Sequence, residues 1–307
     1  MIPTFPSFKK LAIDDKKQIE SITSVFSPYS DFNFTSLWSY NVADDIIIST
    51  LYGNLIVRFR DYVTNEPFFS FIGVNNIPGT ISALFYYAEK THVQPVLKLV
   101  PIDNFQKHHL MSGRYELKED PDNFDYIYST AELSALTGSK FDKKRNQINR
   151  FKKDYAEIVP VLLDVISKHI QEELFALFQT WEDNKHKARS ETEHELTAMK
   201  RLLSHVRHFH IITPALRHQN NLIAFSLVEI TREGHGMFHF TKVNTGFRGA
   251  YTMLYHCVAK ELYSRGCLQV NREQDLGIEG LRIAKKGWNP VRYLKKYIIY
   301  PKNYDIK

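Results

Sequence analysis

Long apolar runs are absent from this chain of 307 residues, and their absence excludes the commonest kind of membrane protein. No stretch reaches the roughly 18 apolar residues that a membrane-spanning helix needs, and residues 46–48 are typical of the short runs present. Residues 1–10 also lack the apolar core of a secretory signal. We therefore expect a cytoplasmic protein with no transmembrane segment.

Cysteine is scarce as well. Cys257 and Cys267 are too few for a disulfide framework, and their positions in a predicted helix and strand favour buried free thiols. The histidines are scattered without the spacing of a zinc-binding motif, so we expect no metal site. No nucleophile elbow supports Ser-His-Asp chemistry.

What is present is a globular, basic composition. An apolar fraction of 43%, with 13% aromatic residues, supports packed cores, and the length suits two domains of about 150 residues each. The net charge of +6 and the pI near 9.0 favour polyanionic partners such as RNA, nucleotides or anionic lipid surfaces. Many ordinary proteins are equally basic, so charge alone does not decide the function.

Hydrophobic periodicity predicts a mixed α and β order in the second half of the chain. Leu174, Leu177, Phe178 and Trp181, for example, recur at helical spacing. The expected elements are a strand at 158–163, helices at 167–184 and 193–206, strands at 210–216, 222–229 and 237–243, a helix at 250–264, a strand at 268–271, a helix at 278–286 and strands within 291–300.

The first half repeats this succession of elements. We expect a helix at 14–26, strands at 45–50, 55–60 and 68–72, a helix at 80–91, a strand at 96–100 and a further pair around 115–128. The order predicts an N-terminal domain at residues 1–130, a connecting helix at 131–156 and a C-terminal domain at 157–307. No linker rich in Gly, Ser or Pro separates them, so we expect a rigid connection with a cleft between the halves.

The connecting helix is strongly basic. Within residues 140–154, seven lysines and arginines face two aspartates, a local charge near +5. An apolar stripe for packing is formed by Phe141, Ile148, Phe151 and Tyr155. Lys143, Lys144 and Arg145 are candidates for binding the phosphates of an RNA acceptor end. The alternative is a solvated helix whose charges face water.

A glycine-containing turn leads into the predicted helix at 250–264. Gly246, Arg248 and Gly249 are candidates for phosphate binding, because backbone amides at a helix N-terminus attract anions. An ordinary tight turn would need the same glycines.

The densest group of chemically active side chains follows the predicted strand at 268–271. Glu273 and Asp275 are candidate bases or ligands of an ammonium group, and Arg272 is a candidate for binding a phosphate or a developing oxyanion. Asn271 and Lys285 are further substrate-binding candidates. The alternative is structural: Asp275 caps a helix, and Arg272 with Glu273 forms a surface ion pair worth under about 1 kcal/mol.

Residues 271–282, followed by Trp288, Asn289 and Pro290, resemble the signature segment of one family. That family comprises soluble relatives of the catalytic domain of lysyl-phosphatidylglycerol synthases (phosphatidylglycerol lysyltransferases). Residues 140–151 and 295–297, and the helices with Trp181 and Glu195-x-x-x-Met199, extend the resemblance. It implies an α+β fold of two tandem GNAT-like domains, which resemble acyl-CoA N-acyltransferases. Each has a mixed, mostly antiparallel sheet flanked by helices.

The resemblance also implies an activity: transfer of an aminoacyl group from aminoacyl-tRNA to an amine or hydroxyl acceptor. GNAT enzymes bind the coenzyme A pyrophosphate with an Arg/Gln-x-x-Gly-x-Gly/Ala loop. Gly246 and Tyr251 depart from that pattern, which disfavours coenzyme A as the cofactor. Full-length synthases carry a membrane domain ahead of this region, and its absence disfavours phosphatidylglycerol as acceptor. A basic surface could still make peripheral contact with lipid. An acyl-CoA-dependent N-acyltransferase and a non-catalytic RNA- or anion-binding protein remain the alternatives.

Overall fold

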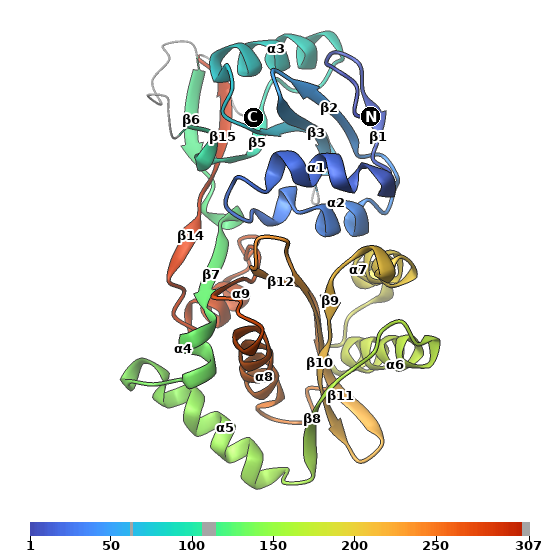
Figure 1. The fold of residues 1–307 in the computed structure, drawn as a ribbon, viewed down its shortest axis with the longest axis vertical. Helices are drawn as coiled ribbons and strands as arrows, with labels where there is room; N and C mark the ends of the chain where they lie inside the picture. The colour runs from blue at the N-terminus through green and yellow to red at the C-terminus, as the bar shows by residue number, and fades with distance from the viewer. Residues whose placement is uncertain (62–63, 106–114, 303–307) are drawn as a thin grey trace. The chain divides into compact units, whose positions relative to one another are not determined.

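The computed structural model describes residues 1–61, 64–105 and 115–302, which form two compact units (Figure 1). Unit 1 comprises Met1–Asp125, Gln274–Glu279 and Tyr293–Lys307, and unit 2 comprises Tyr126–Glu273 and Gly280–Arg292. The units are interleaved, because the chain returns to unit 1 twice after leaving it. The division expected from the sequence, at residues 1–130, 131–156 and 157–307, is linear and lacks these returns.

The sheet of unit 1 is completed by a strand from the end of the chain. Its order is β1 (Lys9–Lys10), β2 (Ile47–Leu51), β3 (Asn54–Arg60), β4 (Pro67–Ile72), β5 (Leu97–Pro101), β15 (Lys296–Pro301) and β6 (Tyr115–Glu119). β15 is antiparallel to both of its neighbours, with Tyr297 opposite Val100 and Glu119. Ile299 of β15 is fully buried in the core, so the C-terminal strand is an integral part of unit 1.

Helices cover both faces of this sheet (Figure 1). α3 (Ile77–Lys90) carries Ile77, Ile81, Leu84 and Ala88 at helical spacing and packs them into the core of β3, β4 and β5. α1 (Lys16–Thr23) and α2 (Phe34–Tyr40) lie on the opposite face. Asn33 caps α2 by accepting a hydrogen bond from the Ser36 amide at 2.9 Å.

A closed ionic cluster lies inside unit 1, and we call it the Lys296 cluster. The Lys296 ammonium is fully buried and pairs with Asp31 and, at 2.8 Å, with Asp125. Ser30 donates to Asp125 at 2.7 Å through its hydroxyl and at 2.7 Å through its amide. Its hydroxyl also lies 2.9 Å from Oε1 of Gln274. This cation therefore has all of its charge matched inside the fold.

The sheet of unit 2 has the order β14 (Arg292–Leu294), β7 (Asp125–Ser129), β13 (Gln269–Asn271), β12 (Gly236–Val243), β11 (Asn221–Ile230), β10 (Pro214–His218) and β8 (Ile158–Leu162). β9 (Ile211–Ile212) pairs with β11 off this path. Strands β8 to β12 pair antiparallel, and β12 with β13 is parallel.

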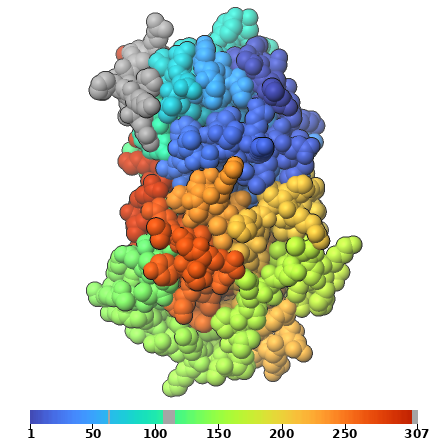
Figure 2. All heavy atoms as spheres, in the orientation of Figure 1, coloured from blue at the N-terminus to red at the C-terminus, as the bar shows by residue number. Residues whose placement is uncertain are grey.

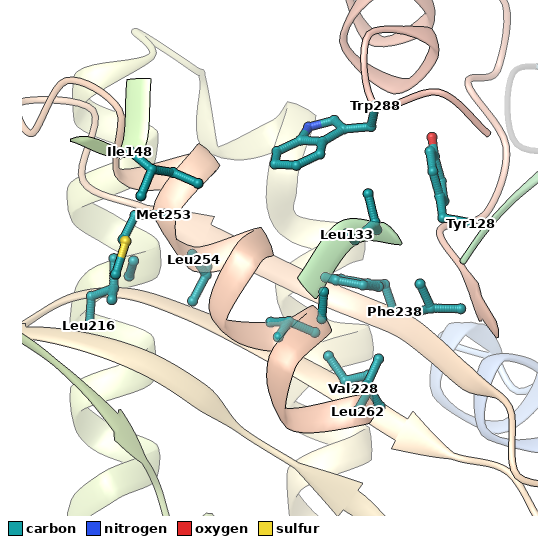
Figure 3. Packing of buried hydrophobic residues seen from close by; sticks show 14 of the residues in the cluster. Tyr128, Leu133, Ile148, Leu216, Val228, Phe238, Met253, Leu254, Leu262 and Trp288 are labelled. Carbon is teal, nitrogen blue, oxygen red and sulfur yellow. The ribbon is translucent and has the colours of Figure 1, made fainter. Parts of the chain in front are cut away.

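Helices also lie on the two faces of the second sheet. On one face α8 (Ala250–Ser264) packs against the strands and against α4 (Thr130–Ala135) and α5 (Asp142–Asp154). Figure 3 shows Leu254 and Leu262 of α8 among Val228 and Phe238 of the strands. α6 (Lys168–Asn184) covers the other face with α7 (Arg189–Ser204), and α9 (Glu279–Lys286) follows β13. In the part of the chain that is described, no helix is both long and apolar enough to cross a membrane.

The architecture confirms the predicted fold class of two tandem GNAT-like domains with mixed sheets flanked by helices. The strand predicted at 210–216 is divided into β9 and β10. The helix predicted to begin at 193 begins at Arg189, since the Glu191 carboxylate accepts the Ala188 amide at 2.9 Å and caps its first turn. α2 was not predicted, because it is short and buried over most of its length. The connecting helix predicted at 131–156 is divided into α4 and α5.

Candidate functional site

The sheet of unit 2 opens between two parallel strands. β12 and β13 are paired only where Gly236 faces Val270 and Met237 faces Asn271. β12 continues to Val243, whereas β13 ends at Asn271 and the chain turns into the segment that leads to α9. We call this edge of β12, with the turn beside it, the opening. Ligands in sheet proteins commonly bind where parallel strands end and diverge.

A bulge marks the same stretch of β12. Leu227 faces Phe240 and Val228 faces Phe238, so His239 is the extra residue opposite β11. The buried His239 ring lies 3.2 Å from the Glu229 carboxylate. Bulges bend a strand and often lie next to functional sites, so the bulge is consistent with the position of the opening.

The turn after β13 is held by its own polar groups. The Asn271 side chain accepts a hydrogen bond from the Glu273 amide at 2.7 Å, and Glu273 has a left-handed φ of 55°. The Lys285 ammonium donates to the carbonyl oxygens of Arg272 and, at 3.1 Å, Glu273. In this structure, therefore, these contacts of Asn271 and Lys285 shape the turn, although both were predicted to bind substrate. Strained backbone of this kind is concentrated at functional sites.

Arg272 is a buried cation in an aromatic surrounding. The residue is 7% exposed, and Cζ lies 3.8 Å from the ring centre of Tyr255. The rings of Tyr128 and Phe238 follow at 5.2 and 5.6 Å. Nη1 has no hydrogen-bond partner, and within the described residues the guanidinium forms no ion pair. Burying such a group costs free energy that an anionic ligand would recover.

Lys144 of α5 lies close to the aromatic rings around Arg272, because Trp288 and Tyr255 have their ring centres 5.9 Å apart. Its ammonium lies 4.4 Å from the ring centre of Trp288. Burial, followed by the charges of Arg272 and Lys143, lowers the pKa of Lys144 to about 8. None of the carboxylates in the described ranges forms an ion pair with Lys144. Two cations that repel each other without a counter-ion are suited to binding an anion.

The other two predicted residues of α5 are placed differently. Lys143 is exposed. Arg145 donates to the carbonyl oxygens of Leu136 and, at 2.8 Å, Gly138, and it pairs with Asp142. Of the three candidates, only Lys144 lies against the Trp288 ring, which packs on the Tyr255 ring that Arg272 contacts. Figure 2 shows orange and red atoms, from the part of the chain that contains α8 and α9, at the visible surface next to green atoms of α4 and α5.

Lys242, a further buried lysine, is not among the residues predicted from the sequence. Lys242 of β12 is 3% exposed, pairs with Glu195 at 2.7 Å and lies 3.7 Å from the ring centre of Trp181. Burial lowers the pKa of Lys242, and burial raises the pKa of Tyr251, whose hydroxyl accepts a hydrogen bond from Trp181. The signal in the sequence was a lysine in a strand rich in apolar residues, β12, which also contains His239 and Thr241.

The carboxylates of the turn have separate surroundings. Glu273 belongs to unit 2, as Arg272 does, and is partly exposed. Asp275 belongs to unit 1 and is fully buried; its carboxylate accepts the Gly277 amide at 2.9 Å, and its carbonyl accepts the Ile278 amide at 3.0 Å. These bonds give Asp275 a part in forming the turn. The pKa of Tyr293 is raised, mainly by the burial of its own hydroxyl and secondly by the negative charge of Asp275.

The turn before α8 is likewise only partly available to a ligand. The Gly246 amide donates to the Asn244 side chain at 3.0 Å. Gly249 has a φ of 94°, which a residue with a side chain rarely adopts, and its carbonyl accepts the first α-helical hydrogen bond of α8, from the Met253 amide, at 3.0 Å. Arg248 is exposed and forms no ion pair with any described residue.

Comparison with known proteins gives a family and a fold. The family described as "Phosphatidylglycerol lysyltransferase, C-terminal" matches residues 28–300. An uncharacterized protein of Mycoplasmoides gallisepticum is 23% identical over 175 residues, which cover 57% of this chain. The match spans 55%, about half, of the length of that curated relative.

Solved structures extend the likeness over nearly the whole chain. A conserved protein of unknown function from Bacteroides thetaiotaomicron is 26% identical with a TM-score of 0.80, over 97% of this chain and 99% of that one. A domain described as the C-terminal part of a lysylphosphatidylglycerol synthetase from Agrobacterium fabrum has a TM-score of 0.67 at 13% identity, over 94% and 92%. For L-PGS from Bacillus licheniformis the TM-score is 0.63 at 13% identity, over 100% and 95%. The last two show a shared fold.

Proposed function

Because the chain belongs to the phosphatidylglycerol lysyltransferase C-terminal family, we propose that it is a transferase that moves an aminoacyl group from aminoacyl-tRNA to an amine or hydroxyl acceptor. The family and the tandem GNAT-like fold support the transferase class. The donor and the acceptor are proposals that rest on the chemistry of the opening.

One observation carries the proposal: Arg272 is buried at the opening and its Nη1 has no hydrogen-bond partner, while Lys144 lies against Trp288, whose ring packs on the Tyr255 ring that Arg272 contacts. An aminoacyl-tRNA presents phosphates beside the ester that reacts. A guanidinium and an ammonium, partly shielded from water by Tyr255 and Trp288, bind such anionic oxygens more strongly than exposed cations do. Burial, followed by the charges of Arg272 and Lys143, lowers the pKa of Lys144, and an anion bound beside the ammonium would favour its charged form.

The reaction itself needs few further groups. The acceptor nitrogen or oxygen forms a bond to the ester carbonyl carbon, and the carbonyl oxygen becomes an oxyanion. The bond to the ribose oxygen then breaks, and the proton lost by the acceptor is balanced by the proton gained by the ribose hydroxyl. Arg272 is suited to stabilising the oxyanion or the neighbouring phosphate. Glu273 stays our candidate base, and Asp275 is proposed to fix the turn that presents it.

Radiolabelled transfer from a panel of aminoacyl-tRNAs tests this function. The panel is offered with amine, hydroxyl and phosphatidylglycerol acceptors, and deacylation to water is counted as well. We expect one or a few donors to be consumed. Arg272→Met and Lys144→Met should abolish most of that turnover, whereas Arg232→Met and Lys153→Met, which change exposed cations, should not.

No consumption of any donor would contradict the proposal. In that case, stabilisation of the protein by coenzyme A in a thermal-shift measurement would favour an acyl-CoA-dependent N-acyltransferase. Salt-sensitive RNA binding without turnover would favour a non-catalytic protein on the same scaffold.

A further inference from the structure

A separate hollow lies in unit 2, on the α6 side of the sheet. It has a volume of about 430 Å³ and lies between α6, the β10–β11 hairpin and the turn from β12 to α8 (Figure 1). This volume is within the range of small-molecule sites, roughly 300 to 1,000 Å³. Neither Arg272 nor Lys144 lines it, so it is distinct from the opening.

The lining of the hollow is partly apolar and partly aromatic. Leu177, Leu222 and Ile223 supply apolar surface. Phe247 supplies a ring, which we call the aromatic wall, and its centre lies 5.4 Å from that of His218 and 5.3 Å from that of Tyr155. A ring that packs against two others in this way loses little freedom when a flat ligand stacks on it.

Three asparagines line the same hollow. Asn220, Asn221 and Asn244 all line the hollow. Asn244 is oriented, because its Oδ1 accepts from the Asn184 amide group at 2.9 Å and from the Gly246 amide at 3.0 Å. Its Nδ2 therefore remains as a donor. Within the described ranges, the side chains of Asn220 and Asn221 form no hydrogen bond, so each still offers a donor and an acceptor.

The charges at the rim are already compensated. Glu173 pairs with Arg217, and His218 lies 2.9 Å from the Glu157 carboxylate. The hollow thus attracts a neutral ligand more than an ion. The ligand should have a flat ring for the aromatic wall and neighbouring donor and acceptor groups for the amides. A nucleobase has both properties, and amide side chains pair with base edges through matched donors and acceptors.

We propose that this hollow binds a nucleobase, stacked on Phe247 and hydrogen-bonded by Asn220, Asn221 and Asn244. The base belongs to a free nucleoside or nucleotide, or to an unpaired residue at the end of an RNA. This proposal does not depend on the proposed transferase activity, and a binding measurement is enough to test it.

Titration of the full chain with adenosine, guanosine, cytidine and uridine tests the site, with binding followed by saturation-transfer NMR and calorimetry. At least one nucleoside should bind with a dissociation constant below about 10 mM. The double variant Asn220→Ala, Asn221→Ala should weaken that binding about tenfold, since two hydrogen bonds are lost. Ala176→Phe, which fills the hollow from α6, should abolish it.

The matched control is the double variant Asn146→Ala, Asn149→Ala, which removes two exposed amides from α5 and should bind as the wild type does. Absence of binding by all four nucleosides overturns the proposal, and so does binding that neither hollow variant weakens. A short RNA that ends in the preferred base separates the two sources. Tighter binding of the RNA assigns the site to an RNA end, and equal binding assigns it to a free nucleoside or nucleotide.

Discussion

Two buried cations of this protein have opposite surroundings. Lys296 in unit 1 is fully buried and pairs with Asp31 and Asp125. Arg272 in unit 2 is nearly as buried, yet its neighbours are aromatic rings, and no carboxylate pairs with it in the part of the chain that is described. The difference separates two uses of a buried charge. A buried charge that has a counter-ion in the protein is part of the folded structure. A buried charge without one destabilises the protein until a ligand of opposite charge binds.

The largest effect on stability should come from breaking the Lys296 cluster. Lys296→Met leaves two buried carboxylates without their cation, so we expect the free energy of unfolding to fall by about 3–5 kcal/mol. Urea unfolding measures the change. Lys295→Met is the control: this neighbouring lysine pairs with Glu119 at the surface, and its loss should leave the unfolding midpoint nearly unchanged. Equal midpoints for the two variants would show that the cluster is not structural.

Removal of the unmatched cation should have the converse result. Arg272→Met should reduce aminoacyl transfer by about 10²- to 10³-fold, as loss of an oxyanion-stabilising group does elsewhere. Its unfolding midpoint should stay close to that of the wild type, because no ion pair is broken. The comparison fails if Arg272→Met unfolds as easily as Lys296→Met does. Arg232→Met controls for the loss of one positive charge.

Lys144 makes the comparison sensitive to pH. Its pKa is lowered from 10.5 to about 8, so the ammonium is charged below that pH and neutral above it. Affinity for sulfate, whose charge does not change in this range, should therefore fall as the pH rises through about 8. Fluorescence of Trp288, which the ammonium faces, offers the readout. Lys144→Arg should bind sulfate without this pH dependence.

Stability should change in the opposite direction over the same range. Because the folded-state pKa of Lys144 lies below its unfolded value, the unfolded chain binds more protons between about pH 8 and 10.5. The contribution of Lys144 to the free energy of unfolding should therefore rise with pH across that window.

The sulfate titration decides whether Lys144 belongs to the anion site. A wild-type sulfate affinity that stays constant from pH 7 to 9.5 would contradict the assignment of Lys144 to the anion site.

The smallest effect should come from the ring under Arg272. Tyr255→Leu removes a cation–π contact and should weaken sulfate binding about fivefold, whereas Tyr255→Phe keeps the ring and should change it little. Calorimetric titration compares the two variants. Equal losses would show that the hydroxyl of Tyr255, and not its ring, positions the guanidinium.

Local sequence patterns predicted the elements better than their partners. The helix predicted at 250–264 has those bounds in the structure, because Leu254, Val258 and Leu262 recur every four residues along a buried face. The strands within 291–300 were also expected. That β15 enters the sheet of unit 1 between β5 and β6 was not predictable, since strand pairing is decided by contacts distant in sequence.

The same limit applies to the site. Arg272 and Lys144 were both candidates from charge and position, but Arg145 was an equal candidate. Its guanidinium donates hydrogen bonds to the carbonyl oxygens of Leu136 and Gly138. Both residues have left-handed φ values, of 49° and 80°. Lys285 is engaged in the same manner by the turn after β13. Such backbone partners have no signature in the sequence.

A double-mutant cycle on sulfate affinity tests the central claim most directly, the claim being that Arg272 and Lys144 hold one anion together. The four proteins are the wild type, Arg272→Met, Lys144→Met and the double variant, at pH 7. We predict that each single variant loses most of the affinity and that the double variant loses little more, a coupling of at least about 1 kcal/mol. Losses that simply add, or an Arg272→Met protein that binds sulfate as the wild type does, would contradict it.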